Sequence, residues 1–218
     1  MIRDDYMVEK LKRVDIGAWE PKSAIGKMVK SGEITSLEKI IEMGKPVIES
    51  QVIDFLLPEL EVETLRISTT QRVTDSGKRT KFRVVVVVGD RKCHVGVGVG
   101  KSDELKPAMD YAVKEAKKNM IAITMGCGSW ECRCSTKHSV PLKIQGKEGS
   151  TLITLKPAPK GLGLAGNDVV KKVLGMAGVQ DVWSSMSGGR NVYNMAMAAI
   201  HALDNLNTLR PMPEGEKS

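Results

Sequence analysis

The chain has 218 residues, of which 41% are hydrophobic and 27% are charged, and this is the composition of a soluble globular protein. Its longest strongly apolar run, Val84 to Val88, is far shorter than a membrane-spanning helix, and the charged start MIRDDYMVEKLKR argues against a signal peptide. We therefore expect a cytoplasmic protein without a membrane span, whose four cysteines are reduced thiols or metal ligands.

The excess of positive charge is confined to one window, from Arg66 to Lys101. This window holds nine Lys or Arg residues and two Asp, whereas the rest of the chain balances 24 basic against 24 acidic residues. A surface with such an excess attracts a polyanion. The charge distribution thus favours nucleic acid as the partner.

Residues 1–59 are predicted to form an N-terminal extension of short helices without a strand. The clearest helix runs from Thr35 to Met43, where Thr35 and Glu38 form a capping box and Gly44 supplies the stop. The extension is too small to fold alone. We expect it to pack on the body of the protein or on a partner.

Residues 60–123 change to a pattern of strands and one helix. The β-branched run from Phe82 to Val88 ends in a Gly89-Asp90 turn, and His94 to Val99 returns with glycine at every second position. One face of that strand has no side chains. Such a face indicates that another backbone or a ligand approaches closely.

The helix of this region is predicted to begin near Lys106. An inner stripe of small and apolar residues should lie on the sheet, while three lysines should form a solvated face. The stripe comprises Met109, Ala112, Val113, Ala116 and Met120, and the lysines are Lys114, Lys117 and Lys118.

Residues 124–139, TMGCGSWECRCSTKHS, are a polar, cysteine-rich connector and the expected joint between two domains. Beyond it, the alternation of apolar residues and the helix boundaries predict the order β-β-α-β-α, and residues 211–218 should be disordered. The predicted fold class is therefore α+β. The expected divisions are 1–59 for the extension, 60–123 for an α/β domain, 124–210 for a C-terminal α/β domain and 211–218 for the tail.

Two glycine motifs resemble nucleotide-binding loops. GVGVGKS at Gly96 to Ser102 differs from a P-loop because Val95 occupies the position of the first glycine. Gly161, Gly163 and Gly166 match G-x-G-x-x-G with Asp181 twenty positions after the first glycine, but PAPK separates them from the strand. We expect neither motif to bind a nucleotide. Lys101 would instead lie near nucleic-acid phosphate, and Lys160 would either lie near phosphate or simply be exposed.

Three cysteines and a histidine lie within twelve residues of the connector, at Cys127, Cys132, Cys134 and His138. Thiolates and imidazole are suitable ligands for tetrahedral zinc, and such a crosslink would stabilise an irregular loop. Two alternatives stay open, a structural zinc ion and reduced cysteines without metal. Cys93 lies apart from this group, inside the predicted strand, and its side chain is expected to be packed against other residues.

We expect no enzyme. The histidines at positions 94, 138 and 201 occupy three different contexts, and local spacing places no serine or carboxylate beside them. Aromatic residues amount to 4%, which argues against a sheet that stacks single-stranded bases. Trp19, Trp130 and Trp183 are therefore predicted to be packing residues.

The basic loop, Gly-Asp turn and glycine strand together resemble the S-five family of small-ribosomal-subunit proteins, in its archaeal form. The family pattern is matched by Gly77, Lys78, Phe82, Val84, Gly89, Asp90, Gly96 and Gly98, and Cys93 stands where the pattern has glycine. WEPKSAIGKMVKSGEI is similar to the archaeal and eukaryotic extension, and HSVPLKI, LKPAPKGLGL and MAGVQDVW are similar to the C-terminal domain. The resemblance covers about residues 19 to 206.

The resemblance implies a double-stranded-RNA-binding-like α/β domain, a second α/β domain and a structural role in the small ribosomal subunit. It implies a place near the mRNA entry, an effect on decoding accuracy with the S-four neighbour, and contact with the S-eight neighbour. The family has a histidine at the place of His138 even without a cysteine cluster. Ribosomal RNA is expected to meet Arg72, Lys78, Arg79, Lys81, Arg83, Gly96, Gly98, Lys101 and Lys160.

Two other function classes stay as alternatives to a ribosomal protein. One is a nucleotide-using enzyme, whose ligand affinity would depend little on salt, and the other is a free-standing RNA-binding or chaperone module. The steep salt dependence of phosphate contacts distinguishes the first, and sedimentation with small subunits distinguishes the second.

Overall fold

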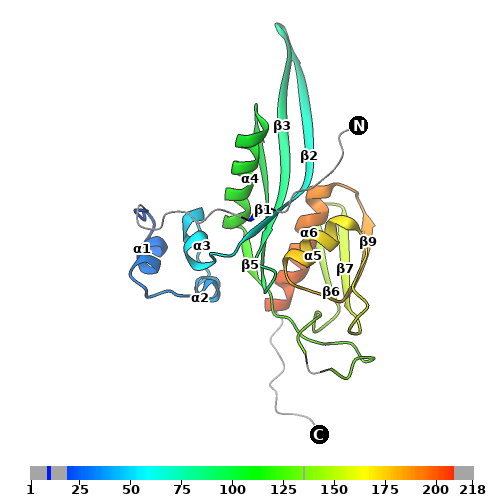
Figure 1. Ribbon diagram of the computed structural model, residues 1–218. Coiled ribbons are helices and arrows are strands. Elements are labelled where there is room, and N and C mark those ends of the chain that lie inside the picture. Colours follow the sequence, from blue (N-terminus) through cyan, green and yellow to red (C-terminus); the bar gives the residue numbers. More distant parts are fainter. Residues whose placement is uncertain (1–8, 11–18, 135, 209–218) are drawn as a thin grey trace.

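The computed structural model describes residues 9–10, 19–134 and 136–208, and it confirms the predicted α+β class (Figure 1). The first sheet has the order β1-β2-β3-β4-β5 and the second has the order β6-β7-β9-β8. The predicted disordered tail, 211–218, lies outside the described residues.

The first sheet is antiparallel and carries helix α4 on one face. Its strands are β1 (Glu9–Lys10), β2 (Glu61–Thr74), β3 (Gly77–Gly89), β4 (His94–Ser102) and β5 (Met120–Ala122), and α4 spans Leu105–Lys118. The prediction of no strand in residues 1–59 was wrong, because β1 pairs with β2 through Glu9 opposite Val62. A strand of two residues is too short to show a side-chain pattern.

The glycine face of β4 is covered by α4. A Cβ atom on Gly96, Gly98 or Gly100 would overlap backbone atoms of the helix. The facing helix positions are alanines four residues apart, and all three are fully buried: Ala108, Ala112 and Ala116. Of the two expected occupants of this bare face, another backbone is therefore the one present, and helix and sheet lie close because neither has a bulky side chain here.

The second sheet is covered on one face by two helices. Its strands are β6 (Ile144–Glu148), β7 (Thr151–Pro157), β8 (Leu164–Ala165) and β9 (Val182–Gly188), and the helices are α5 (Asp168–Met176) and α6 (Val192–Thr208). The predicted β-β-α-β-α order lacks β8, which adds two residues parallel to β9 before α5. A strand of two residues is too short to show the alternation of apolar and polar residues from which a strand is predicted.

One hydrophobic cluster joins the two sheets, because α5 and α6 lie between them (Figure 1). Val85 and Val87 of β3 belong to this shared cluster, whereas Val84, Val86 and Val88 point to the α4 side. The strand is thus buried on both faces. This burial is the physical reason for its uninterrupted valine run.

The N-terminal extension folds into helices α1 (Ala24–Lys30), α2 (Leu37–Glu42) and α3 (Ser50–Leu56). The predicted capping box is wrong, since the N-cap residue of α2 is Ser36 and its side chain makes no capping hydrogen bond. The extension has a small core of its own and packs on α4, as expected. The predicted solvated face of α4 is also partly wrong, because Lys117 is buried and contacts Asp54 of α3 at 2.5 Å.

Candidate nucleic-acid interface and metal centre

The β2–β3 hairpin extends beyond the rest of the molecule (Figure 1). Strand β4 pairs with β3 only from Phe82 onward, so residues 69–81 form a two-stranded ribbon. Every residue of this ribbon is exposed except Thr80, which is half-buried. The projecting hairpin, defined as residues 69–81, thus offers both faces and its tip to a partner.

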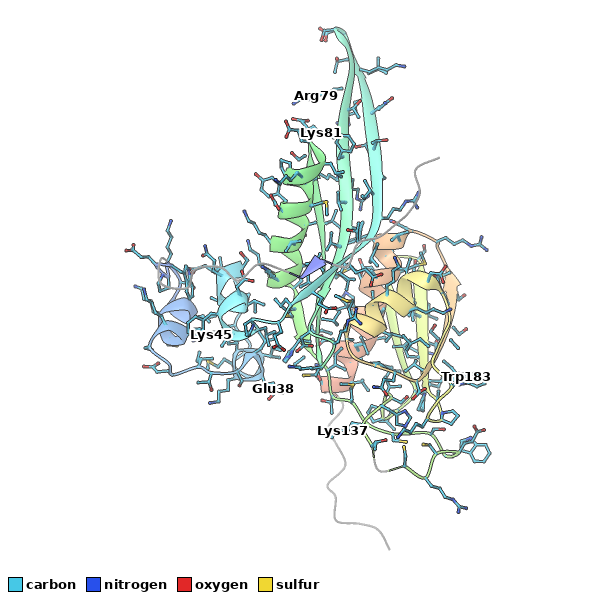
Figure 2. The ribbon with its side chains drawn as sticks, viewed as in Figure 1. Glu38, Lys45, Arg79, Lys81, Lys137 and Trp183 are labelled. Atoms are coloured by element: carbon cyan, nitrogen blue, oxygen red, sulfur yellow. The ribbon has the colours of Figure 1, made fainter. Side chains whose placement is uncertain are left out.

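Register places most of the predicted RNA-binding cations on one face of the hairpin. Arg79 lies opposite Arg72. Lys81 and Arg83 follow Arg79 on the same face by the two-residue period of a strand, and Lys101 lies opposite Arg83. Direct cross-strand partners share a face, so these five side chains form one cationic row. Figure 2 shows Arg79 and Lys81 on this part of the hairpin.

Lys78 departs from this row. It lies opposite Val73 and therefore belongs to the other face. The prediction had grouped it with the remaining cations because they are close in sequence. The one-residue offset from Arg79 is what separates them.

Asp103 is the acidic neighbour of the row. Its carboxylate lies 3.6 Å from Arg79 and 3.7 Å from Lys81. All three side chains are well exposed, and exposed ion pairs contribute little stability. Arg79 and Lys81 can therefore exchange Asp103 for phosphate at small cost.

Three predicted contacts have a different structural role. Gly96 and Gly98 are buried under α4, so their assignment to RNA binding is contradicted. Arg83 is half-buried, and its guanidinium carbon lies 5.9 Å from the centre of the Tyr193 ring of α6. Arg83 thus links the base of the row to the second domain through a cation–π contact.

The predicted metal ligands are brought together by the connector. Their donor atoms all lie within 4.8 Å of one another. The sulfur atoms of Cys132 and Cys134 are 2.8 Å apart, those of Cys134 and Cys127 are 3.5 Å apart, and Nε2 of His138 is 3.7 Å from Cys132. Zinc–sulfur bonds of about 2.3 Å place ligand atoms roughly 3.8 Å apart. The contacts of 3.5 and 3.7 Å are near this value, whereas Cys132 and Cys134 would have to separate around an ion. Three thiols and an imidazole are nevertheless the residue types that tetrahedral zinc takes.

Asp181 orients the histidine of this cluster. Its Oδ2 accepts a hydrogen bond from Nδ1 of His138 at 2.8 Å, and its Oδ1 accepts the amides of Gly161 and Gly163 at 3.0 and 2.8 Å. Both glycines have positive φ, of 92° and 77°. The G-x-G motif and its distant aspartate therefore form a loop that holds the Asp181 carboxylate.

Protons are unevenly distributed among the cluster residues. Burial raises the pKa of Cys127 to about 11, whereas the hydrogen bond from Cys132 lowers the pKa of Cys134 to about 6. Burial alone would lower the pKa of His138, but hydrogen bonds to Cys132, Asp181 and Cys134 raise it. A thiolate is thus ready at Cys134, and metal binding would displace the proton of Cys127.

Lys160 adjoins the cluster through its neighbours in the glycine loop. Its side chain is exposed beside Gly161, whose amide is held by Asp181. The loop that carries this predicted RNA contact is consequently tied to the histidine of the cluster.

Each histidine has a carboxylate partner that sequence spacing did not identify. The absence of a locally placed carboxylate was a wrong inference, because Asp90 contacts Nδ1 of His94 at 2.6 Å from four residues away. The partners of His138 and His201 are distant in sequence. Asp90 also accepts the amides of Lys92, Cys93 and His94, so it holds the turn before β4, and Cys93 lies in that turn rather than inside the strand.

Two of the three tryptophans contradict the expectation of packing. Trp19 is buried, but Trp130 is 91% exposed and Trp183 is 51% exposed. Trp130 lies in the cysteine-rich connector and Trp183 lies on β9.

No helix among residues 9–10, 19–134 and 136–208 is long and apolar enough to cross a membrane.

Comparison with known proteins matches both domains to one family. Residues 60–124 match ribosomal protein S5, N-terminal domain, and residues 146–215 match ribosomal protein S5, C-terminal domain. The small ribosomal subunit protein uS5 of Methanocaldococcus jannaschii is 50% identical over 201 residues, which are 92% of this chain and 93% of the relative. The protein of that name from Aeropyrum pernix is 45% identical over 88% of this chain and 89% of its own length. The chain belongs to the ribosomal protein S5 family.

Proposed function

We propose that the chain is a structural, non-enzymatic constituent of the small ribosomal subunit that binds small-subunit rRNA through phosphate contacts. The cationic row on one face of the projecting hairpin carries this proposal, because four of its five basic side chains are exposed where a phosphate backbone can reach them: Arg72, Arg79, Lys81 and Lys101. The relatives named above are small ribosomal subunit proteins. Their archaeal sources also support an archaeal form of the family.

The proposal includes the place and partners that the family resemblance implies. The chain would lie near the mRNA entry, contribute to translational accuracy with the S-four neighbour, and contact the S-eight neighbour. Residues 60–123 and 124–210 would act as its two domains, with residues 1–59 as an extension and 211–218 as a tail. Lys78 and Lys160 would add phosphate contacts outside the row.

A salt titration of rRNA binding tests the main proposal. The variant Arg72→Gln, Arg79→Gln, Lys81→Gln should weaken binding and reduce the slope of log affinity against log salt by about 2 to 3, since each lost phosphate contact removes somewhat less than one unit. A matched variant changes Lys27, Lys39 and Lys45 to Gln in the extension, where all three side chains are exposed. Equal slopes for both variants would reject the row as the phosphate contact.

We further propose that Cys127, Cys132, Cys134 and His138 hold a structural zinc ion. Four protein ligands leave no open position, so the metal would crosslink the connector rather than catalyse a reaction. The support is the donor set and the carboxylate behind His138. Protein purified without chelator should contain about one zinc per chain by mass spectrometry, and a negligible content would reject the site.

A further inference from the structure

Within the described part of the chain, no helix covers the outer face of the second sheet. Helices α5 and α6 lie against the opposite face, where Ile153 and Leu155 of β7 are fully buried (Figure 1). Because side chains alternate along a strand, the intervening residues point outward. The outer face, as used below, consists of the exposed residues Gln145, Lys147, Lys156, Trp183, Ser185 and Ser187.

This face is basic and rich in hydrogen-bonding groups. Glu148 is the single acid in the four strands, and it turns inward to pair with His201 of α6 at 3.5 Å. Within the described part of the chain, neither Lys147 nor Lys156 forms an ion pair. Two unneutralised ammonium groups thus lie among an amide and two serine hydroxyls.

Trp183 gives the face an aromatic surface. It lies opposite Lys156 on β7 and beside Ala165 on β8, and half of its side chain is exposed. Figure 2 shows it on the side of the second domain that faces away from the first sheet. Alanine on the next strand leaves room beside the ring, so a flat group could stack there.

We propose that this outer face binds an unpaired stretch of small-subunit rRNA, with a base stacked on Trp183 and phosphates near Lys147 and Lys156. The inference rests on the proposed function and adds a second RNA contact to the hairpin. Charge complementarity favours RNA over a protein partner, because the face has lysines without acids. Besides Trp183, its apolar residues are the half-buried Leu152 and the small Ala165. An unpaired stretch is required because a paired helix does not expose the faces of its bases.

Affinity of the full chain for a transcript of archaeal small-subunit rRNA tests this proposal. Trp183→Ala should weaken binding by about tenfold, the size expected for one stacked base, and Trp183→Phe should retain most of the affinity. Lys147→Gln with Lys156→Gln should lower the salt slope by about 1 to 2. Trp130→Phe is the matched control, since Trp130 is even more exposed but lies in the connector.

Fluorescence gives a readout that does not depend on affinity. In the Trp130→Phe background, Trp19 is buried, so quenching by acrylamide reports mainly on Trp183. Added rRNA should protect Trp183 from acrylamide. Circular dichroism shows whether each variant is folded. If Trp183→Ala does not fold, the comparison of Trp183→Phe with wild type still tests the proposal.

The outcomes separate this inference from the proposed function. If wild type binds rRNA and the hairpin variant is weakened, but Trp183→Ala and the double lysine variant bind like wild type, the outer face is rejected and the proposed function stands. Protection of Trp183 only after small-subunit proteins are added would overturn the inference in favour of a protein partner. If wild type does not bind rRNA, both fail.

Discussion

His138 donates its Nδ1 proton to Asp181 at 2.8 Å and thereby directs Nε2 toward the cysteine sulfurs. Both residues are buried, so neither can easily find another partner. A carboxylate behind a metal-binding histidine fixes its tautomer and orientation. The pair therefore connects the cysteine-rich connector to β9 and to the glycine loop.

Asp181→Asn should weaken zinc binding by about 10- to 100-fold, the usual effect of removing such a partner. Asparagine has no negative charge and only one side-chain oxygen. It therefore cannot accept hydrogen bonds from both the His138 ring and the two glycine amides. Competition with a chromophoric chelator measures the affinity. Asp168→Asn is the control because Asp168 is exposed at the start of α5, and an affinity within twofold of wild type for Asp181→Asn would contradict the assigned role.

Gly98→Ala should destabilise the first sheet by about 1 to 3 kcal/mol, the cost of overpacking a close interface. The added methyl would overlap backbone atoms of Ala112 and Ala116. Urea unfolding measures the change. Gly175→Ala is the matched control, because its nearest neighbour would be Leu164 at 3.9 Å, and it should not destabilise the chain.

Lys117→Met should lower the free energy of unfolding by about 2 to 3 kcal/mol, because it leaves Asp54 partly buried without its cation. The side chains of this pair are 8% and 17% exposed, and they join α4 to the extension. Faster proteolysis of the extension should accompany the loss. Adding Asp54→Leu should recover stability, whereas Lys92→Met, at an exposed ion pair, should change little. No recovery in the double variant would argue against the pair as the cause.

Acid should remove a stabilising contribution of Asp90. Burial alone would raise the pKa of Asp90, but hydrogen bonds from the His94 ring and from three amides lower it below the ordinary value of 3.8. A lowered folded-state pKa means that the contribution is present above pH 3.8 and is lost as the pH falls toward the folded-state pKa.

Urea unfolding of wild type and Asp90→Asn across this acid range tests the prediction. Asparagine can still accept the amides, but it has no charge to lose. The stability difference between the two proteins should shrink as the pH falls. A constant difference would show that Asp90 does not act through its charge.

Features that depend on neighbouring residues along the chain could be predicted from the amino-acid sequence. Alternating glycines predicted the bare face of β4, and the valine run predicted a buried strand. The spacing in the connector predicted a group of possible metal ligands, Cys127, Cys132, Cys134 and His138. The concentration of charge between Arg66 and Lys101 likewise needed no structure. Local periodicity and composition are sufficient for such features.

Which groups face one another could be seen only in the folded molecule. It covered Gly96 and Gly98 with α4, buried Lys117 against Asp54, exposed Trp183 and placed Asp181 behind His138. These pairings join residues far apart in the chain, and a one-residue change of register moves a side chain to the opposite face, as Lys78 and Arg79 show. Long-range contacts are set by the packing of whole elements, and no local pattern encodes that packing.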